Sequence, residues 1–162
     1  MADEPLITYL HDHLTGSTFA VGLLETWHRD HADSALGIFA ESLRNEIERD
    51  RIELQQLIEH LGATSHPVKV TVGWFAEKAS ELKFNSSEPV SLRIFEGLEM
   101  LALGILGKLA LWEILRVLAA TDSRLAHLDF EGLTTRAKTQ HAQVEVHRIS
   151  LGREVFVQRG AE

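Results

Sequence analysis

The sequence predicts an all-α fold, a bundle of four long helices, from three observations. Apolar residues recur at steps of three and four, which is the period of an amphipathic helix. Helix-starting and helix-stopping residues divide this pattern into four long segments. One long connector, residues 63–88, joins the second segment to the third, whereas the other two connections are tight turns. This combination indicates a bundle with a single long crossover.

The first two helices are expected to form an antiparallel hairpin. The first should span residues 5–31, because Pro5 follows two acidic residues, and both features suit a helix N-terminus. Asp33 and Ser34 are capping residues after a very short turn. Gly62 is the residue type expected just after the end of the second helix.

The connector carries a weaker helical pattern. His66-Pro67 disfavours a helix at its start, and residues 70–84 can form a short one. Such a helix would cover roughly 20 Å at about 1.5 Å per residue, part of the return along the bundle. The third helix would then run parallel to the second.

The third helix should begin at residues 85–89, Asn-Ser-Ser-Glu-Pro, and run to about Ala120. Residues 121–123 break the chain and restart it as a fourth helix that frays toward Gly160. The length of 162 residues suits one domain with a full core, so residues 1–162 are interpreted as a single bundle domain.

Composition excludes several function classes. The formal charge of −8 and the scattered Lys and Arg residues argue against a nucleic-acid partner. The absence of cysteine excludes disulfides, thiolate metal sites and thiol nucleophiles. The chain begins MADEPLITYL, without the basic and apolar regions of a signal peptide, so a cytoplasmic protein is expected.

The most apolar segment, residues 98–120, is expected to be a buried helix, with no membrane association. It carries Glu99, Lys108, Glu113 and Arg116. Each charge near a bilayer centre would cost roughly 2.5–3.5 kcal/mol, which four charges make prohibitive.

One aspartate interrupts the apolar face of the second helix. The face is formed by Leu36, Ala40, Leu43, Ile47, Asp50, Leu54, Leu57 and Leu61. A carboxylate in or beside a core needs a partner. Tight hairpins fix which residues share a level within each pair of helices, and they place His13 near Asp50. If the third helix runs parallel to the second, Lys108, Arg136 and Gln140 fall within two turns of the same level. We therefore expect a buried polar network of these five residues.

The motifs of a di-iron centre are missing. Such a centre needs a Glu-x-x-His pair on each of two helices. The nearest matches are Glu46 with Arg49 and Glu145 with Arg148. Arginine stays protonated and cannot donate a lone pair to iron.

Three stretches, YLHDHLTGS, LRNEIERDR and FEGLEMLALGILGKLALWEIL, resemble small uncharacterised bacterial proteins described as ferritin-like. The resemblance covers about residues 6–150. It implies a ferritin-like four-helix bundle, with the long crossover between the second and third helices, that is usually dimeric or larger. It does not imply iron oxidation, because the Glu-x-x-His motifs have no match here.

A rearranged metal site is the alternative. His28 and His147 continue the apolar faces of the first and fourth helices, and Glu96 and Glu99 fall near the level of His147. Two imidazoles and one or two carboxylates could hold Fe, Mn or Zn with open positions. This alternative predicts a metal-dependent oxidoreductase or a metal-binding stress protein, whereas the leading interpretation expects no cofactor.

The third helix is apolar almost all round, so something must cover its outer face. A symmetric homodimer through this helix and the connector is one explanation, with Trp74, Phe75 and Trp112 as anchors. Coverage by the connector of the same chain is the other. The leading hypothesis is therefore a non-enzymatic, dimeric binding or interaction module with a degenerate metal site. A carrier of a small molecule is a third possibility, with the ligand unidentified.

Overall fold

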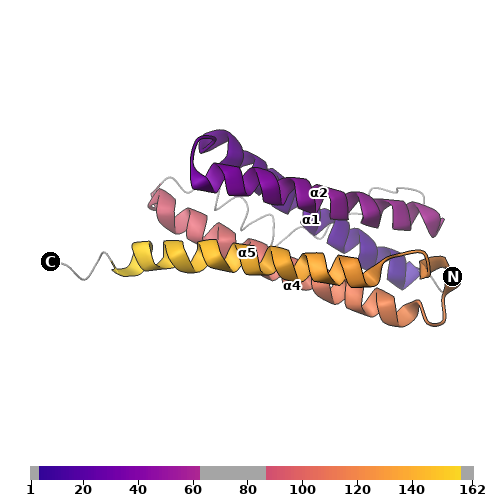
Figure 1. Cartoon of the computed structure of the whole chain (residues 1–162). Helices are drawn as coiled ribbons and strands as arrows, with labels where there is room; N and C mark the ends of the chain where they lie inside the picture. The colour runs from indigo at the N-terminus through magenta and orange to yellow at the C-terminus, as the bar shows by residue number, and fades with distance from the viewer. Residues whose placement is uncertain (1–3, 63–86, 158–162) are drawn as a thin grey trace.

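The computed structural model describes residues 4–62 and 87–157, and over these residues the chain is helical, without strands (Figure 1). The long helices are α1 (Glu4–Asp30), α2 (Ala35–His60), α4 (Val90–Leu118) and α5 (Phe130–Val157), and a short 3₁₀ turn, η1 (Ser123–Leu125), precedes α5. The all-α, four-helix prediction is confirmed. The short helix expected over residues 70–84 lies outside the described residues.

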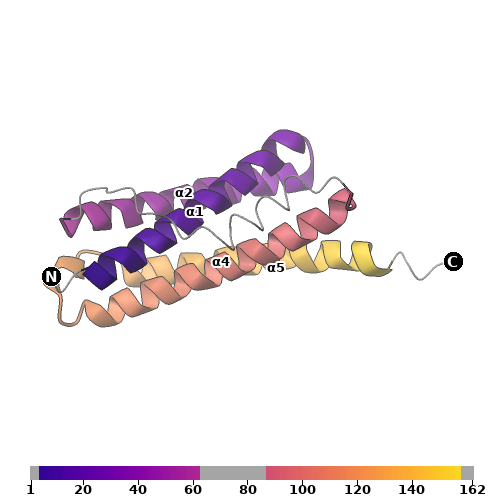
Figure 2. The same ribbon diagram turned by 180° about the vertical axis from the view of Figure 1, so that it is seen from behind.

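The helices form two hairpins that stack on each other. α1 packs along α2, and α4 packs along α5. α2 and α5 face the viewer in Figure 1. Figure 2 shows the opposite side of the bundle, on which α1 and α4 contact each other. α2 and α4 run in the same direction, so the end of α2 and the start of α4 lie at opposite ends of the bundle.

The turn between α1 and α2 forms as the capping residues predict. Ser34 is the N-cap of α2: its Oγ accepts a hydrogen bond from the backbone N–H of Gly37 at 3.2 Å. The same Oγ donates to the carbonyl of His31 at 2.8 Å. At the other end of α2, Gly62 has a positive φ of 79°, the left-handed conformation that glycine adopts without a Cβ penalty.

The start of the last helix differs from the prediction. Asp122 caps only the 3₁₀ turn, accepting from the N–H of Arg124 at 3.0 Å. Leu125 is fully buried and holds this turn in the core. α5 begins later, at Phe130, where Asp129 accepts from the N–H of Gly132 at 3.0 Å. The fourth helix was therefore predicted too early, because two aspartates in this segment can each cap a helical turn.

The core lies along the inner faces of all four helices. Its largest fully buried side chains are Leu10, Leu24, Leu43, Leu57, Leu98, Leu101, Leu111, Trp112, Leu115, Leu125, Gln140 and Val144. α4 supplies the most members of this set, which agrees with its central apolar sequence. Among the described helices, none is long and apolar enough to cross a membrane.

α1 and α4 approach closely where Trp27 covers Gly97. A Cβ added at Gly97 would lie 2.5 Å from Cζ2 of the indole. At Gly104, later on α4, an added Cβ would meet no atom within 4 Å. The same helix is therefore tightly packed at Gly97 and open at Gly104.

This contrast predicts opposite effects for one substitution. Gly97→Ala should lower the free energy of unfolding by about 1–3 kcal/mol, because the new methyl group overlaps Trp27. Gly104→Ala should raise it by up to about 1 kcal/mol, since alanine favours helix and the space is open. Urea denaturation followed by circular dichroism measures both. Equal effects of the two changes would contradict the packing described.

Candidate functional site

Asp50 lies inside the core, on the face of α2 that packs against the rest of the bundle. Its apolar neighbours along that face are buried, except for the partly buried Leu36: Ala40, Leu43, Ile47, Leu54, Leu57 and Leu61. Asp50 itself is only 3% exposed. Its carboxylate therefore depends on protein partners to replace water.

Three side chains from two other helices supply those partners. Lys108 of α4 donates from Nζ to Oδ2 of Asp50 at 2.5 Å, and Arg136 of α5 donates from Nε to Oδ1 at 2.5 Å. Gln140 of α5 donates from Nε2 to Oδ2 at 3.2 Å. Both carboxylate oxygens thus have charged donors, which give stronger hydrogen bonds than neutral ones.

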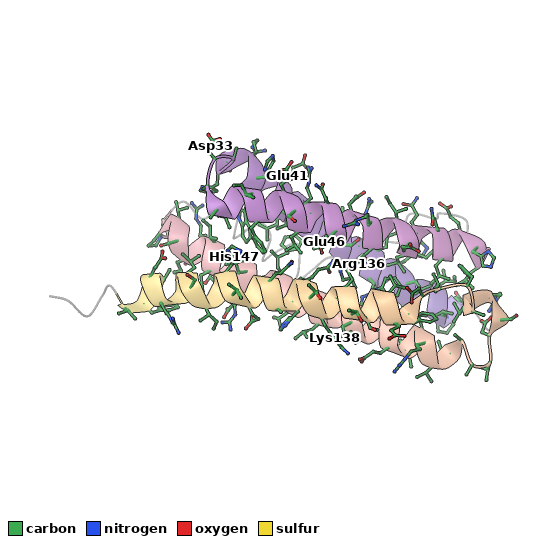
Figure 3. The ribbon with its side chains drawn as sticks, viewed as in Figure 1. Asp33, Glu41, Glu46, Arg136, Lys138 and His147 are labelled. Atoms are coloured by element: carbon green, nitrogen blue, oxygen red, sulfur yellow. The ribbon has the colours of Figure 1, made fainter. Side chains whose placement is uncertain are left out.

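Gln140 links this group to a second carboxylate. Its Nε2 also lies 3.2 Å from Oε2 of Glu46, one turn before Asp50 on α2, and its Oε1 accepts from Lys108. Figure 3 shows Glu46 and Arg136 in the space between α2 and α5. We call Glu46, Asp50, Lys108, Arg136 and Gln140 the polar cluster. It contains two carboxylates and two cations, so its formal charge is zero.

Burial dominates the electrostatics of Lys108. Removal from water lowers the pKa of its ammonium group, and the adjacent Asp50 carboxylate opposes this shift. The side chain is 15% exposed. A buried ion pair is favourable only while both partners are present, because either charge alone would be poorly solvated.

His13, expected in the network, lies outside the polar cluster. Its imidazole packs edge-on against Tyr9, with ring centroids 4.7 Å apart. Burial lowers the pKa of His13, and the nearby Asp12 partly opposes the shift. Both His13 and Asp50 line one cavity, but no hydrogen bond between them is formed.

That cavity lies between α1, α2 and α4 and has a volume of about 360 Å³. Lys108 and Asp50 of the polar cluster line it together with a mainly apolar wall. The apolar lining residues include Tyr9, Phe19, Ala20, Ile47, Leu54, Met100, Leu101, Leu103, Ile105, Leu111 and Trp112. The cavity thus combines aromatic and aliphatic walls with a charged group whose partners are already in place.

Small residues on two helices create the space. Gly16 and Ser17 of α1 and Gly104 and Gly107 of α4 all line it. An added Cβ would meet no atom within 4 Å at Gly16 or Gly104. Sequence reasoning missed the cavity. The available signal was the occurrence of glycine at corresponding levels of the first and third helices.

The residues of the rearranged metal site are not assembled. Nδ1 of His28 lies 3.2 Å from the carbonyl of Gly37, and the ring of His147 stacks on Phe39 with centroids 3.9 Å apart. Within residues 4–62 and 87–157, no three His, Asp or Glu side chains are grouped closely enough to hold a metal ion.

The carboxylates expected in that site differ from the prediction as well. Glu99 is exposed and lies 3.5 Å from Arg148, and Glu96 is partly buried on the same helix. The sequence placed these groups at similar levels along the bundle. In the structure, His28 contacts a backbone carbonyl, His147 contacts an aromatic ring and Glu99 contacts a guanidinium group, so these side chains do not meet.

No protein-family model, curated protein or solved structure matches the chain. The chemistry of the polar cluster and of the adjacent cavity is therefore the basis for assigning a function.

Removing the central carboxylate should be strongly destabilising. Asp50→Ala leaves the buried Lys108 and the partly buried Arg136 with Glu46 as the one remaining carboxylate of the polar cluster, so the free energy of unfolding should fall by about 3–5 kcal/mol. The triple change Asp50→Leu, Lys108→Met and Arg136→Met removes three of the four charges, leaves the partly buried Glu46 beside Gln140, and should recover most of the loss. Urea denaturation provides the measurement.

The matched control is Asp30→Ala, which breaks the exposed pair with Arg29 and should leave stability nearly unchanged. If Asp50→Ala costs no more than this control, the polar cluster does not contribute as described.

Proposed function

We propose that this protein is a non-ferroxidase binding module on a ferritin-like bundle, and that the cavity between α1, α2 and α4 is its ligand site. The observation that carries the proposal is the cavity itself, about 360 Å³ and next to a charge-balanced polar cluster. This volume lies within the range of about 300–1,000 Å³ typical of small-molecule sites.

The polar cluster favours binding over metal chemistry. Metal sites of helical bundles are built from carboxylates and imidazoles that project inward from facing helices. Here Asp50 projects inward, but Lys108 and Arg136 bind both of its oxygens. An ammonium and a guanidinium donate hydrogen bonds and offer no lone pair. A divalent cation at this position would also face two positive charges.

The ferritin-like assignment rests on helix direction and on the sequence resemblance. α2 and α4 run in the same direction, which is the arrangement expected of a bundle with its long crossover between them. The polar cluster lies in the middle of this arrangement, where the resemblance to ferritin-like proteins would otherwise suggest a di-iron centre.

The alternative is an Fe or Mn oxidoreductase, or a metal-binding stress protein, that uses His28, Glu96, Glu99 and His147. The contacts of His28 with Gly37 and of His147 with Phe39 make this arrangement less favourable, because both rings would have to move to share a metal.

The cavity can be tested by filling it. Wild-type protein should bind 1-acetonaphthone, a neutral aromatic ketone smaller than the cavity, with a dissociation constant between about 10 μM and 1 mM. Gly16→Leu should abolish binding, because the new side chain extends into the open space. Gly22→Leu, on the same helix but away from the cavity, is the control. Isothermal titration calorimetry measures both. Binding that survives Gly16→Leu would contradict the site.

Metal content provides a separate test. Protein produced without a tag in medium supplemented with iron, manganese and zinc should contain far less than one metal per chain by elemental mass spectrometry. The double variant His28→Ala, His147→Ala should have the same content. A stoichiometric metal that the double variant loses would instead favour the oxidoreductase.

We also propose that the module is a homodimer formed through the outer face of α4. An exposed apolar stripe runs along this face and consists of Leu103, Leu106, Ala110, Ile114 and Val117. Leu103 and Val117 are 60% and 63% exposed.

The stripe is symmetric about its small central residue. Leu103 and Val117 lie at equal sequence distances from Ala110, and so do Leu106 and Ile114. An antiparallel second copy of α4 would therefore place each large side chain at the level of another large one, and the two alanines at the closest approach. Such self-complementarity is what a two-fold interface requires.

A charge inside the stripe should separate the two copies. Leu106→Glu places a carboxylate and its symmetry mate in the apolar contact, so dimer dissociation should shift by at least tenfold to higher concentration. Sedimentation equilibrium over a range of protein concentrations measures this shift. Val146→Glu replaces a still more exposed apolar residue on α5, 69% against 44% for Leu106, and should leave the equilibrium unchanged. A wild-type chain that stays monomeric throughout would overturn the proposed interface.

A further inference from the structure

The cavity between α1, α2 and α4 is open on one side. Among the residues that line it, Tyr9 and Asp12 of α1 and Leu103 and Gly104 of α4 are exposed. The deeper part of its wall consists of buried side chains of α2 and α4. A ligand in this cavity would therefore be covered by protein on its inner side and left in water at the opening between α1 and α4.

The opening adjoins the exposed apolar stripe of α4. Leu103 belongs to both, because it lines the cavity and is the first residue of the stripe. Gly107, which also lines the cavity, is a neighbour of Leu103 and of Ala110 on the helix surface. Because Gly104 and Gly107 carry no side chain, the apolar surface of α4 continues from the stripe into the cavity.

The proposed two-fold interface brings a second copy of the chain to this edge. In the antiparallel arrangement centred on Ala110, Leu103 lies at the level of Val117 of the partner subunit. Packed helices lie about 8–10 Å apart, so the side chains that face each other are in contact. Val117 of the partner subunit would then lie beside Leu103, at the opening of the cavity.

We propose that a second copy of the chain, packed on the stripe of α4, completes the wall of the cavity at this opening, and that Val117 of the partner subunit contacts the bound ligand. Ligand binding and dimerisation then strengthen each other, because the ligand buries apolar surface against both copies. This inference rests on the proposed ligand site and interface, and adds the coupling between them.

The first test compares ligand binding by the dimer and by a monomeric variant. 1-Acetonaphthone is titrated by calorimetry into the full chain, at a protein concentration where the wild type is dimeric. Val117→Glu should separate the copies and weaken binding of this probe about three- to tenfold. That range corresponds to the loss of about 30–60 Å² of apolar contact.

The position of Val117 excludes a direct effect of this substitution. Within one chain, Val117 does not line the cavity and lies roughly 21 Å along α4 from Leu103. The weaker binding therefore has to come from loss of the second copy. Val146→Glu, on α5 and outside both the stripe and the cavity, is the matched control and should bind the probe as the wild type does.

The reciprocal test measures dimerisation with and without the probe. Coupling between two binding events acts equally in both directions. A dimer has two cavities, so saturating 1-acetonaphthone should lower the dissociation constant of the dimer by the square of the factor above, about ten- to hundredfold. Sedimentation equilibrium measures this shift. Gly16→Leu, which fills the cavity, should abolish the shift.

The outcomes separate the coupling from the two proposals on which it rests. Equal affinity of a dimeric wild type and of Val117→Glu for the probe would overturn the coupling and leave the ligand site and the interface standing. Weaker binding by the dimer would also overturn it, because the second copy would then block the opening. If the probe binds neither protein, the ligand site fails and the coupling with it. If the wild type stays monomeric at every concentration, the interface fails and the coupling with it, whereas binding that Gly16→Leu removes would still support the ligand site.

Discussion

The carboxylate of Asp50 connects the two halves of the bundle. The helices pair as α1 with α2 and α4 with α5, and the backbones of the two hairpins approach each other mainly through α1 and α4. On the opposite side, Asp50 of α2 is bound by Lys108 of α4 and Arg136 of α5. A shift of one residue along a helix moves a side chain by about 1.5 Å and turns it by about 100°. The polar cluster therefore permits one alignment of α2 with α4 and α5.

The same interaction decides what chemistry the centre of the bundle can support. Because both carboxylate oxygens have cationic partners, the acidic group is unavailable to an incoming metal ion. Since Glu46 supplies a second negative charge, the four charged groups balance. The cavity next to them is consequently a mainly apolar space bounded by a neutral polar wall. In the proposed ligand site, shape and apolar contact therefore contribute more than net charge.

The sequence predicts those features of the fold that follow from the helical period and from the tight turns. The interrupted apolar face shows that Asp50 is buried, and the short hairpin turns fix levels well enough to bring Lys108, Arg136 and Gln140 to it. His13 lies near Asp50 along the bundle axis but makes no hydrogen bond with it, because the position of a residue along the axis does not determine the distance between two helices. The start of α5 is missed because Asp122 and Asp129 are equally good caps. The cavity is missed because it depends on which residues face each other across α1 and α4, and period alone does not specify this.

The cavity is difficult to explain by stability alone. Glycine inside a helix costs about 1 kcal/mol relative to alanine, and an unfilled space also loses packing contacts. At Gly97 the cost has a structural reason, because Trp27 occupies the place of a side chain. At Gly16 and Gly104 no atom lies within reach of an added Cβ, so an alanine would fit and would stabilise the helix. Natural proteins seldom reach their stability optimum, and open helical glycines of this kind are a common place where stability can be gained. At these two positions an alanine would therefore exchange cavity volume for helix stability.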